Sequence, residues 1–101
     1  TLYFGGGTPS LLTPAELDVL FTTIHKHFSV AQTAEVTLEA NPDDLTPEKL
    51  VMLKLAGINR LSIGIQSFDE KILRFLNRAH SPEQAHESVV HARHAGFHNI
   101  N

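Results

Sequence analysis

The feature that most constrains the fold is a helix-start signal that occurs three times in 101 residues. Thr13-Pro14, Thr46-Pro47 and Ser81-Pro82 each precede a stretch with apolar residues at helical spacing. A Thr or Ser hydroxyl accepts hydrogen bonds from first-turn N–H groups, and proline fits the first turn because its missing N–H would be unpaired there. Glu16 and Gln84 stand where a capping box places its second side chain. We therefore predict a helix at each signal.

The extents of these helices follow from their apolar periodicity and their stop signals. The first is expected over residues 14–28, with one buried stripe made of Leu17, Leu20, Phe21, Ile24 and Phe28. The other two should end near Gly57 and Gly96, because glycine takes the left-handed conformation after a last turn at little cost. Asp69 is expected to cap a shorter helix that includes Ile72, Leu73 and Leu76.

Extended segments alternate with these helices. They are Leu2 to Phe4, Glu35 to Ala40, Arg60 to Gln66, and Phe97 to Ile100. Strands separated by helices form βαβ units with right-handed crossovers, which give a parallel sheet. The fold class is therefore predicted to be α/β.

The third extended segment alternates between two kinds of side chain. Leu61, Ile63 and Ile65 should face one side, while Ser62, Gly64 and Gln66 face the other. The second segment repeats this pattern, with apolar Val36, Leu38 and Ala40 against polar Glu35, Thr37 and Glu39. Strands of a doubly wound sheet are apolar on both faces, because helices cover both. The alternation instead favours part of a (βα) TIM-like barrel with a polar lumen.

Composition excludes several classes of function. The net charge is −3 and the eight Lys and Arg residues are scattered, so nucleic-acid binding is not expected. There is no basic-apolar leader and no apolar run of about 18 residues, so we expect no membrane span and a cytoplasmic location. Both ends of the sequence fall in apolar extended segments, and we therefore expect residues 1–101 to be an internal fragment of a longer domain.

Metal binding by this chain is not expected. The sequence has no cysteine, so thiolate ligands must come from elsewhere. Its seven histidines lack metal-site spacing, since His91 and His94 lie one turn apart with no Glu-bearing motif. Most are expected on solvated helix faces.

Candidate site residues gather at the carboxyl ends of the predicted strands, where α/β barrels build their sites. Gly5-Gly6-Gly7 allows close approach to a ligand or simply a tight turn. Glu39 needs either an internal Lys or Arg partner or a ligand cation or hydroxyl. Gln66 can bind a ligand or make a structural hydrogen bond. Arg78, taken alone, is typical of a solvated surface charge.

Four motifs together resemble one family. They are Tyr3-Phe4-Gly5-Gly6-Gly7-Thr8-Pro9-Ser10, Glu39-Ala40-Asn41-Pro42, Asn59 through Phe68, and Leu76-Asn77-Arg78. The whole chain is similar, in order and spacing, to radical S-adenosylmethionine (SAM) enzymes of the oxygen-independent coproporphyrinogen III oxidase family and to the related heme chaperones. The resemblance identifies residues 1–101 as a piece of the radical SAM core domain that lacks the segment with the cluster-binding cysteines.

The resemblance also implies cofactors and residue roles. A 4Fe-4S cluster, held by cysteines outside this chain, would cleave SAM reductively with electrons from a donor protein. Gly5, Gly6, Gly7, Thr8 and Pro9 would line the methionine end of SAM, and Glu39 matches a cofactor-contacting glutamate. Gln66 and Arg78 match positions that contact a second SAM in the oxidase. No residue of this chain would be catalytic or bind a metal.

Two activities fit the resemblance. One is oxidative decarboxylation of coproporphyrinogen III to protoporphyrinogen IX, a step of porphyrin biosynthesis. The alternative is a heme chaperone that binds and delivers heme without oxidase activity, and the segments Glu39-Ala40-Asn41-Pro42 and Ile65-Gln66-Ser67-Phe68 are more similar to that branch. A third possibility is a phosphate-binding sugar-metabolism barrel. It explains the alternation of strands and helices but not the presence of all four motifs in one chain. The fragment by itself is expected to be inactive.

Overall fold

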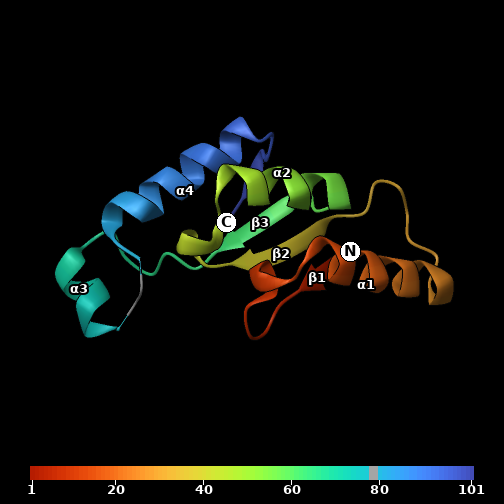
Figure 1. The fold of residues 1–101 in the computed structure, drawn as a ribbon, viewed down its shortest axis with the longest axis horizontal. Coiled ribbons are helices and arrows are strands. Elements are labelled where there is room, and N and C mark those ends of the chain that lie inside the picture. The colour runs from red at the N-terminus through yellow and green to blue at the C-terminus, as the bar shows by residue number, and fades with distance from the viewer. Residues whose placement is uncertain (78–79) are drawn as a thin grey trace.

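The computed structural model describes residues 1–77 and 80–101 (Figure 1). Its sheet has four strands in the order β1-β2-β3-β4, and each neighbouring pair is parallel. The strands are β1 Leu2–Phe4, β2 Val36–Ala40, β3 Arg60–Ile63 and β4 Asn99–Ile100. The predicted parallel α/β sheet is therefore confirmed.

Helices connect the strands in sequence. The α-helices are α1 Pro14–His27, α2 Pro47–Ala56, α3 Glu70–Phe75 and α4 Pro82–His94. Two short 3-10 helices come after β1 and β2: η1 Pro9–Leu11 follows residues 5–8, and η2 Pro42–Asp44 follows Asn41. Each lies between the end of a strand and the start of the next α-helix, so both belong to the carboxyl-terminal rim of the sheet.

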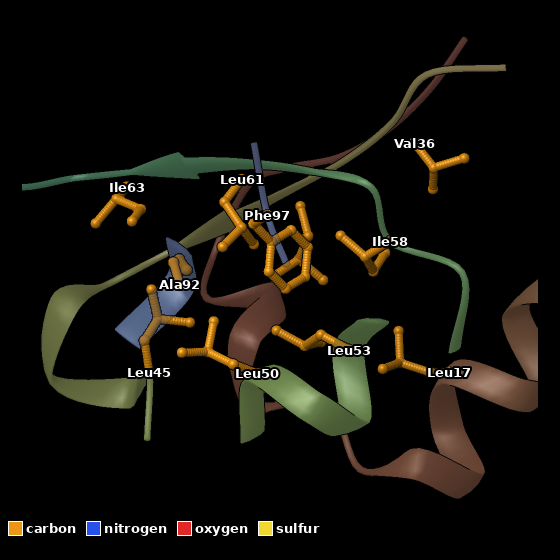
Figure 2. Close-up of a cluster of buried hydrophobic side chains, with 12 residues drawn as sticks. Leu17, Val36, Leu45, Leu50, Leu53, Ile58, Leu61, Ile63, Ala92 and Phe97 are labelled. Carbon is orange, nitrogen blue, oxygen red and sulfur yellow. The ribbon is translucent and has the colours of Figure 1, made fainter. Parts of the chain in front are cut away.

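The core lies on one face of the sheet, between the strands and the helices (Figure 2). Leu17 of α1, Leu53 of α2 and Ala92 of α4 belong to the same cluster as Leu38 and Leu61 of the central strands. All three helices therefore cover the same face. The strand order follows the chain order without reversal, whereas a doubly wound sheet reverses its order and carries helices on both faces. This arrangement is that of a segment of a β/α barrel.

The helix starts are formed by the predicted caps. The Thr13 hydroxyl accepts a hydrogen bond from the Glu16 N–H over 3.2 Å, and the Glu16 carboxylate accepts one from the Thr13 N–H over 3.0 Å. Ser81 and Gln84 form the same reciprocal pair. The Thr46 hydroxyl caps α2, and the Asp69 carboxylate caps α3. All four predicted helices are therefore present.

The helix ends also follow the sequence. Gly57 has φ 111° and closes α2 in the left-handed conformation, and Gly96 has φ 97° beyond the end of α4. The predicted stripe of α1 is only partly right. Leu17 is buried, but Leu20 is 37% exposed because it faces the open edge of the sheet beside β1. Phe28 is 69% exposed because α1 has already ended there.

Three strands are shorter than predicted: β2 begins at Val36 rather than Glu35, and β3 and β4 are shortened further. β3 stops at Ile63 because the chain then turns tightly: the Ile65 N–H donates to the Ile63 carbonyl over 2.9 Å, and Gln66 has φ 71°. β4 begins at Asn99 rather than Phe97, which is fully buried in the core. The predicted role of Arg78 falls on a residue outside the described part of the chain.

No helix in residues 1–77 and 80–101 has the length and apolar character needed to cross a membrane.

Candidate functional site

The carboxyl ends of β1, β2 and β3 surround a cavity of about 340 Å³ on the face of the sheet opposite the core. Its lining comes from the glycine turn, the end of β2 and the segment after β3, namely Gly7, Thr8, Pro9, Glu39, Ala40, Asn41, Ser62, Gly64 and Gln66. This volume falls within the range of roughly 300–1,000 Å³ that is typical of ligand pockets. The lining is rich in amide, hydroxyl and carboxylate groups, so it suits a polar ligand.

Glu39 is the charged residue in that lining, and the fold holds both of its carboxylate oxygens. The Tyr3 hydroxyl donates a hydrogen bond to Oε1 over 2.7 Å. The Gly6 backbone N–H donates one to Oε2 over 3.1 Å. Tyr3 comes from β1 and Gly6 from the turn after it, so the carboxylate joins the neighbouring strand to the glycine turn.

The charge of Glu39 is not neutralised by its partners. The hydrogen bonds from Tyr3 and then from the Gly6 N–H hold the pKa of the Glu39 carboxyl below its usual value. The same contact raises the pKa of the Tyr3 hydroxyl, since losing its proton beside a carboxylate is unfavourable. Within the described part of the chain Glu39 forms no ion pair with Lys or Arg. The cavity therefore presents a negative charge toward a ligand.

The glycine turn has the shape that its sequence predicts. Gly6 and Gly7 have φ values of 78° and 62°, a region that favours glycine. Gly5 is needed for another reason: a Cβ there would lie 2.8 Å from the Tyr3 ring and 3.0 Å from Glu39 Oε1. The turn therefore requires glycine both for its backbone and for the space beside Glu39.

Gln66 lies in the tight turn after β3 and borders the cavity. A buried histidine supports this turn, because a ring nitrogen of His80 lies 2.7 Å from the carbonyl oxygen of Ile65. His80 is only 4% exposed and is thus an exception to the expectation of solvated histidines. Among the described residues, no group of three His, Asp or Glu side chains could hold a metal ion.

The structure brings together most of the residues chosen from the sequence. Gly7, Thr8, Pro9, Glu39 and Gln66 line one cavity, while Gly5 and Gly6 contact Glu39 from the side. Sequence reasoning did not select Tyr3, Asn41, Ser62 or Gly64 as site residues. The signal for Asn41 and Ser62 was available, since Asn41 follows β2 directly and Ser62 belongs to the polar face already noted in β3.

Comparison with known proteins identifies the class. The radical SAM superfamily profile matches residues 1–101, so the chain belongs to that superfamily. This match excludes the sugar-metabolism barrel. Within the superfamily, its relatives include HemW heme chaperones and oxygen-independent coproporphyrinogen III oxidases.

Individual relatives show how far the similarity reaches. The heme chaperone HemW of Bacillus subtilis is 42% identical over 101 residues, which are 99% of this chain and 27% of that protein. HemW of Lactococcus lactis is 40% identical over 100 residues, which are 99% of this chain and 26% of that protein. An oxygen-independent coproporphyrinogen III oxidase of Bradyrhizobium diazoefficiens is 39% identical over 99% of this chain and 22% of that protein. The chain thus spans about a quarter of the length of these relatives.

Solved structures with a similar fold include a member of the same superfamily. Coproporphyrinogen III oxidase (HemN) from Escherichia coli, a radical SAM enzyme, matches with a TM-score of 0.87 and 34% identity, over 99% of this chain and 23% of that one. Elp3 of Methanocaldococcus infernus matches with a TM-score of 0.69 over 86% of this chain and 24% of that one. At 20% identity, this second match shows the fold alone.

Proposed function

We propose that the cavity at the ends of β1, β2 and β3 is part of the SAM-binding site of a longer radical SAM protein of heme or porphyrin metabolism. The observation that carries this proposal is the convergence of the glycine turn, Glu39 and Gln66 on one cavity. Residues 1–101 would then be a fragment of the core domain. By itself this fragment would be inactive.

The donor set of the cavity fits SAM. This cofactor carries a sulfonium and an ammonium group, and the ionised Glu39 supplies the opposite charge. Thr8, Asn41, Ser62 and Gln66 provide hydroxyl and amide groups, which suit the ribose, the adenine and the amino-acid carboxylate. The turn of Gly5, Gly6, Gly7, Thr8 and Pro9 would line the methionine end.

When bound beside a reduced 4Fe-4S cluster, SAM supplies a 5′-deoxyadenosyl radical. The chain has no cysteine, so the cluster ligands belong to another part of the proposed protein. The residues of this chain would bind SAM, orient it and balance its charge. A separate electron donor and a cytoplasmic location also belong to the proposal.

Of the two activities, we favour the heme chaperone. Relatives with that name, from the two bacteria above, reach 40% and 42% identity. The segments Glu39-Ala40-Asn41-Pro42 and Ile65-Gln66-Ser67-Phe68 also support this branch. The ligand of the whole protein would then be heme.

The second candidate is oxidative decarboxylation of coproporphyrinogen III. It is supported by the TM-score of 0.87 with the Escherichia coli oxidase and by the 39% identity with the oxidase of Bradyrhizobium. In that case a porphyrinogen would be the substrate, and Gln66 and Arg78 would contact a second SAM. The role of Arg78 rests on the resemblance alone.

One experiment separates the two activities. The full-length protein with a reconstituted cluster is given SAM, a reductant and coproporphyrinogen III, and the same preparation is titrated with heme. Tight heme binding without loss of carbon dioxide from the porphyrinogen supports the chaperone. Turnover to protoporphyrinogen IX selects the oxidase. If SAM does not bind at all, the site itself is refuted.

A further inference from the structure

We infer that Tyr3 is a positioning residue, whose hydroxyl holds the Glu39 carboxylate in the orientation that receives the cationic part of SAM. This inference rests on the proposed function of the cavity. Tyr3 does not itself line the cavity; it acts through Glu39.

The hydrogen bonds around Glu39 leave part of each oxygen free for a ligand. A carboxylate oxygen has about two acceptor sites. Oε1 accepts from the Tyr3 hydroxyl and Oε2 from the Gly6 N–H. Each oxygen therefore retains acceptor capacity for a ligand cation. Because the two donors come from different segments, rotation of the carboxylate would break at least one bond.

The position of Tyr3 in the sheet suits this role. Tyr3 is paired in register with Thr37, two residues before Glu39, on the polar face. To contact Glu39, the Tyr3 side chain must extend along the sheet from the level of Thr37 to the level of Glu39. The phenol ring is long enough to place the hydroxyl there. Tyr3 is 58% exposed and belongs to neither the core nor its packed border. Core packing therefore does not explain an aromatic residue here, whereas the hydrogen bond does.

Gly5 makes the pair possible. A Cβ at this position would lie within 3.0 Å of both the Tyr3 ring and Glu39 Oε1. A residue with a Cβ would crowd both side chains, so at least one of them would have to shift. The first glycine of the turn is thus matched to the Tyr3–Glu39 contact.

A double-mutant cycle tests the inference in the full-length protein. The dissociation constant for SAM is measured by calorimetry in the wild type, Tyr3→Phe, Glu39→Ala and the double variant. Loss of the hydroxyl should weaken binding by about 2- to 13-fold, the range for one hydrogen bond. If Tyr3 acts only through Glu39, the double variant should bind as weakly as Glu39→Ala and no weaker.

Two further measurements exclude a merely structural effect. Incorporation of 3-fluorotyrosine at position 3, which keeps the hydroxyl, should restore affinity lost in Tyr3→Phe. Thr23→Val is the control, because it removes another exposed hydroxyl, one that donates a hydrogen bond to the Val19 carbonyl within α1. Thr23 does not line the cavity, so SAM affinity should be unchanged. Thermal melting of each variant checks that the fold is intact.

The outcomes distinguish the positioning role of Tyr3 from the proposed binding of SAM in the cavity. If Glu39→Ala weakens binding but Tyr3→Phe does not, the positioning role is wrong and the site stands. Additive effects in the double variant would also overturn it, because Tyr3 would then act on SAM independently. If Glu39→Ala binds SAM like the wild type, the proposed function of Glu39 fails instead.

Discussion

The Ser10 hydroxyl donates a hydrogen bond to the Asp44 carboxylate over 3.0 Å, which ties the segment after β1 to the segment after β2. Ser10 is fully buried in η1, and Asp44 is the last residue of η2. Thr8 and Pro9 precede Ser10 directly, and Asn41 precedes η2; all three border the cavity. The bond therefore joins two walls of the candidate site.

Ser10→Ala should lower the free energy of unfolding of the full-length protein by about 1–3 kcal/mol, because it removes a partly buried hydrogen bond to a charged group. Urea unfolding measures the change. Thr23→Ala removes an exposed hydroxyl that donates a hydrogen bond to the Val19 carbonyl, and it should change this free energy by about 0.5 kcal/mol or less. Equal effects of the two variants would show that the link between the loops contributes nothing to stability.

Glu39→Gln should weaken SAM binding by about 5- to 150-fold, the range for loss of a charged hydrogen-bond partner. Calorimetry on the reconstituted protein measures this. Glu35→Gln is the matched control, because Glu35 precedes β2, at the end of the strand opposite Glu39, and does not line the cavity. Unchanged affinity in Glu39→Gln would remove this residue from the site.

Gly5→Ala should reduce SAM affinity by displacing Tyr3 and Glu39, since the new Cβ would approach both within 3.0 Å. Both neighbours are side chains that can move, so we expect the site to distort while the fold remains. Gly57→Ala is the opposite case: with φ 111° it should cost about 1 kcal/mol of stability or more and leave SAM binding intact. Wild-type affinity in Gly5→Ala would contradict this.

The capping box of α1 should make stability depend on pH. Hydrogen bonds from Thr13, first from its backbone N–H, lower the pKa of Glu16 below its ordinary value of 4.5. The ionised form is therefore favoured in the folded state, and its contribution is present above pH 4.5 and lost as the pH falls through the folded-state pKa.

Glu16→Gln keeps the hydrogen-bond geometry but has no charge to titrate. The difference in unfolding free energy between wild type and this variant should be present at pH 7 and shrink below pH 4.5. Urea unfolding at several pH values measures it. A difference that stays constant or grows on acidification would show that the charge of Glu16 plays no part.

The sequence was sufficient for features that depend on neighbouring residues. The caps at Thr13, Thr46, Asp69 and Ser81 involve residues two or three positions apart, so their signals are local. The alternation of β2 and β3 also predicted which face would be apolar. Because parallel strands end at one rim, these local features placed Glu39 and the glycine turn together.

The details that were missed depend on contacts between distant parts of the chain. Tyr3 and Glu39 are 36 positions apart, and their contact depends on the register of β1 against β2. The positive φ of Gln66 belongs to a turn supported by His80, and nothing in the local sequence signals this for a residue other than glycine. Likewise, the helical period predicts a buried Leu20, but this side chain is exposed because it faces the open edge of the sheet beside β1.

The central claim is that the cavity at the ends of β1, β2 and β3 receives SAM. A crystal structure of the full-length protein with SAM tests this most directly. We predict SAM in the cavity, contacting the glycine turn and the Glu39 carboxylate, with Tyr3 still bonded to Glu39. SAM bound elsewhere, with this cavity filled only by water, would contradict the account.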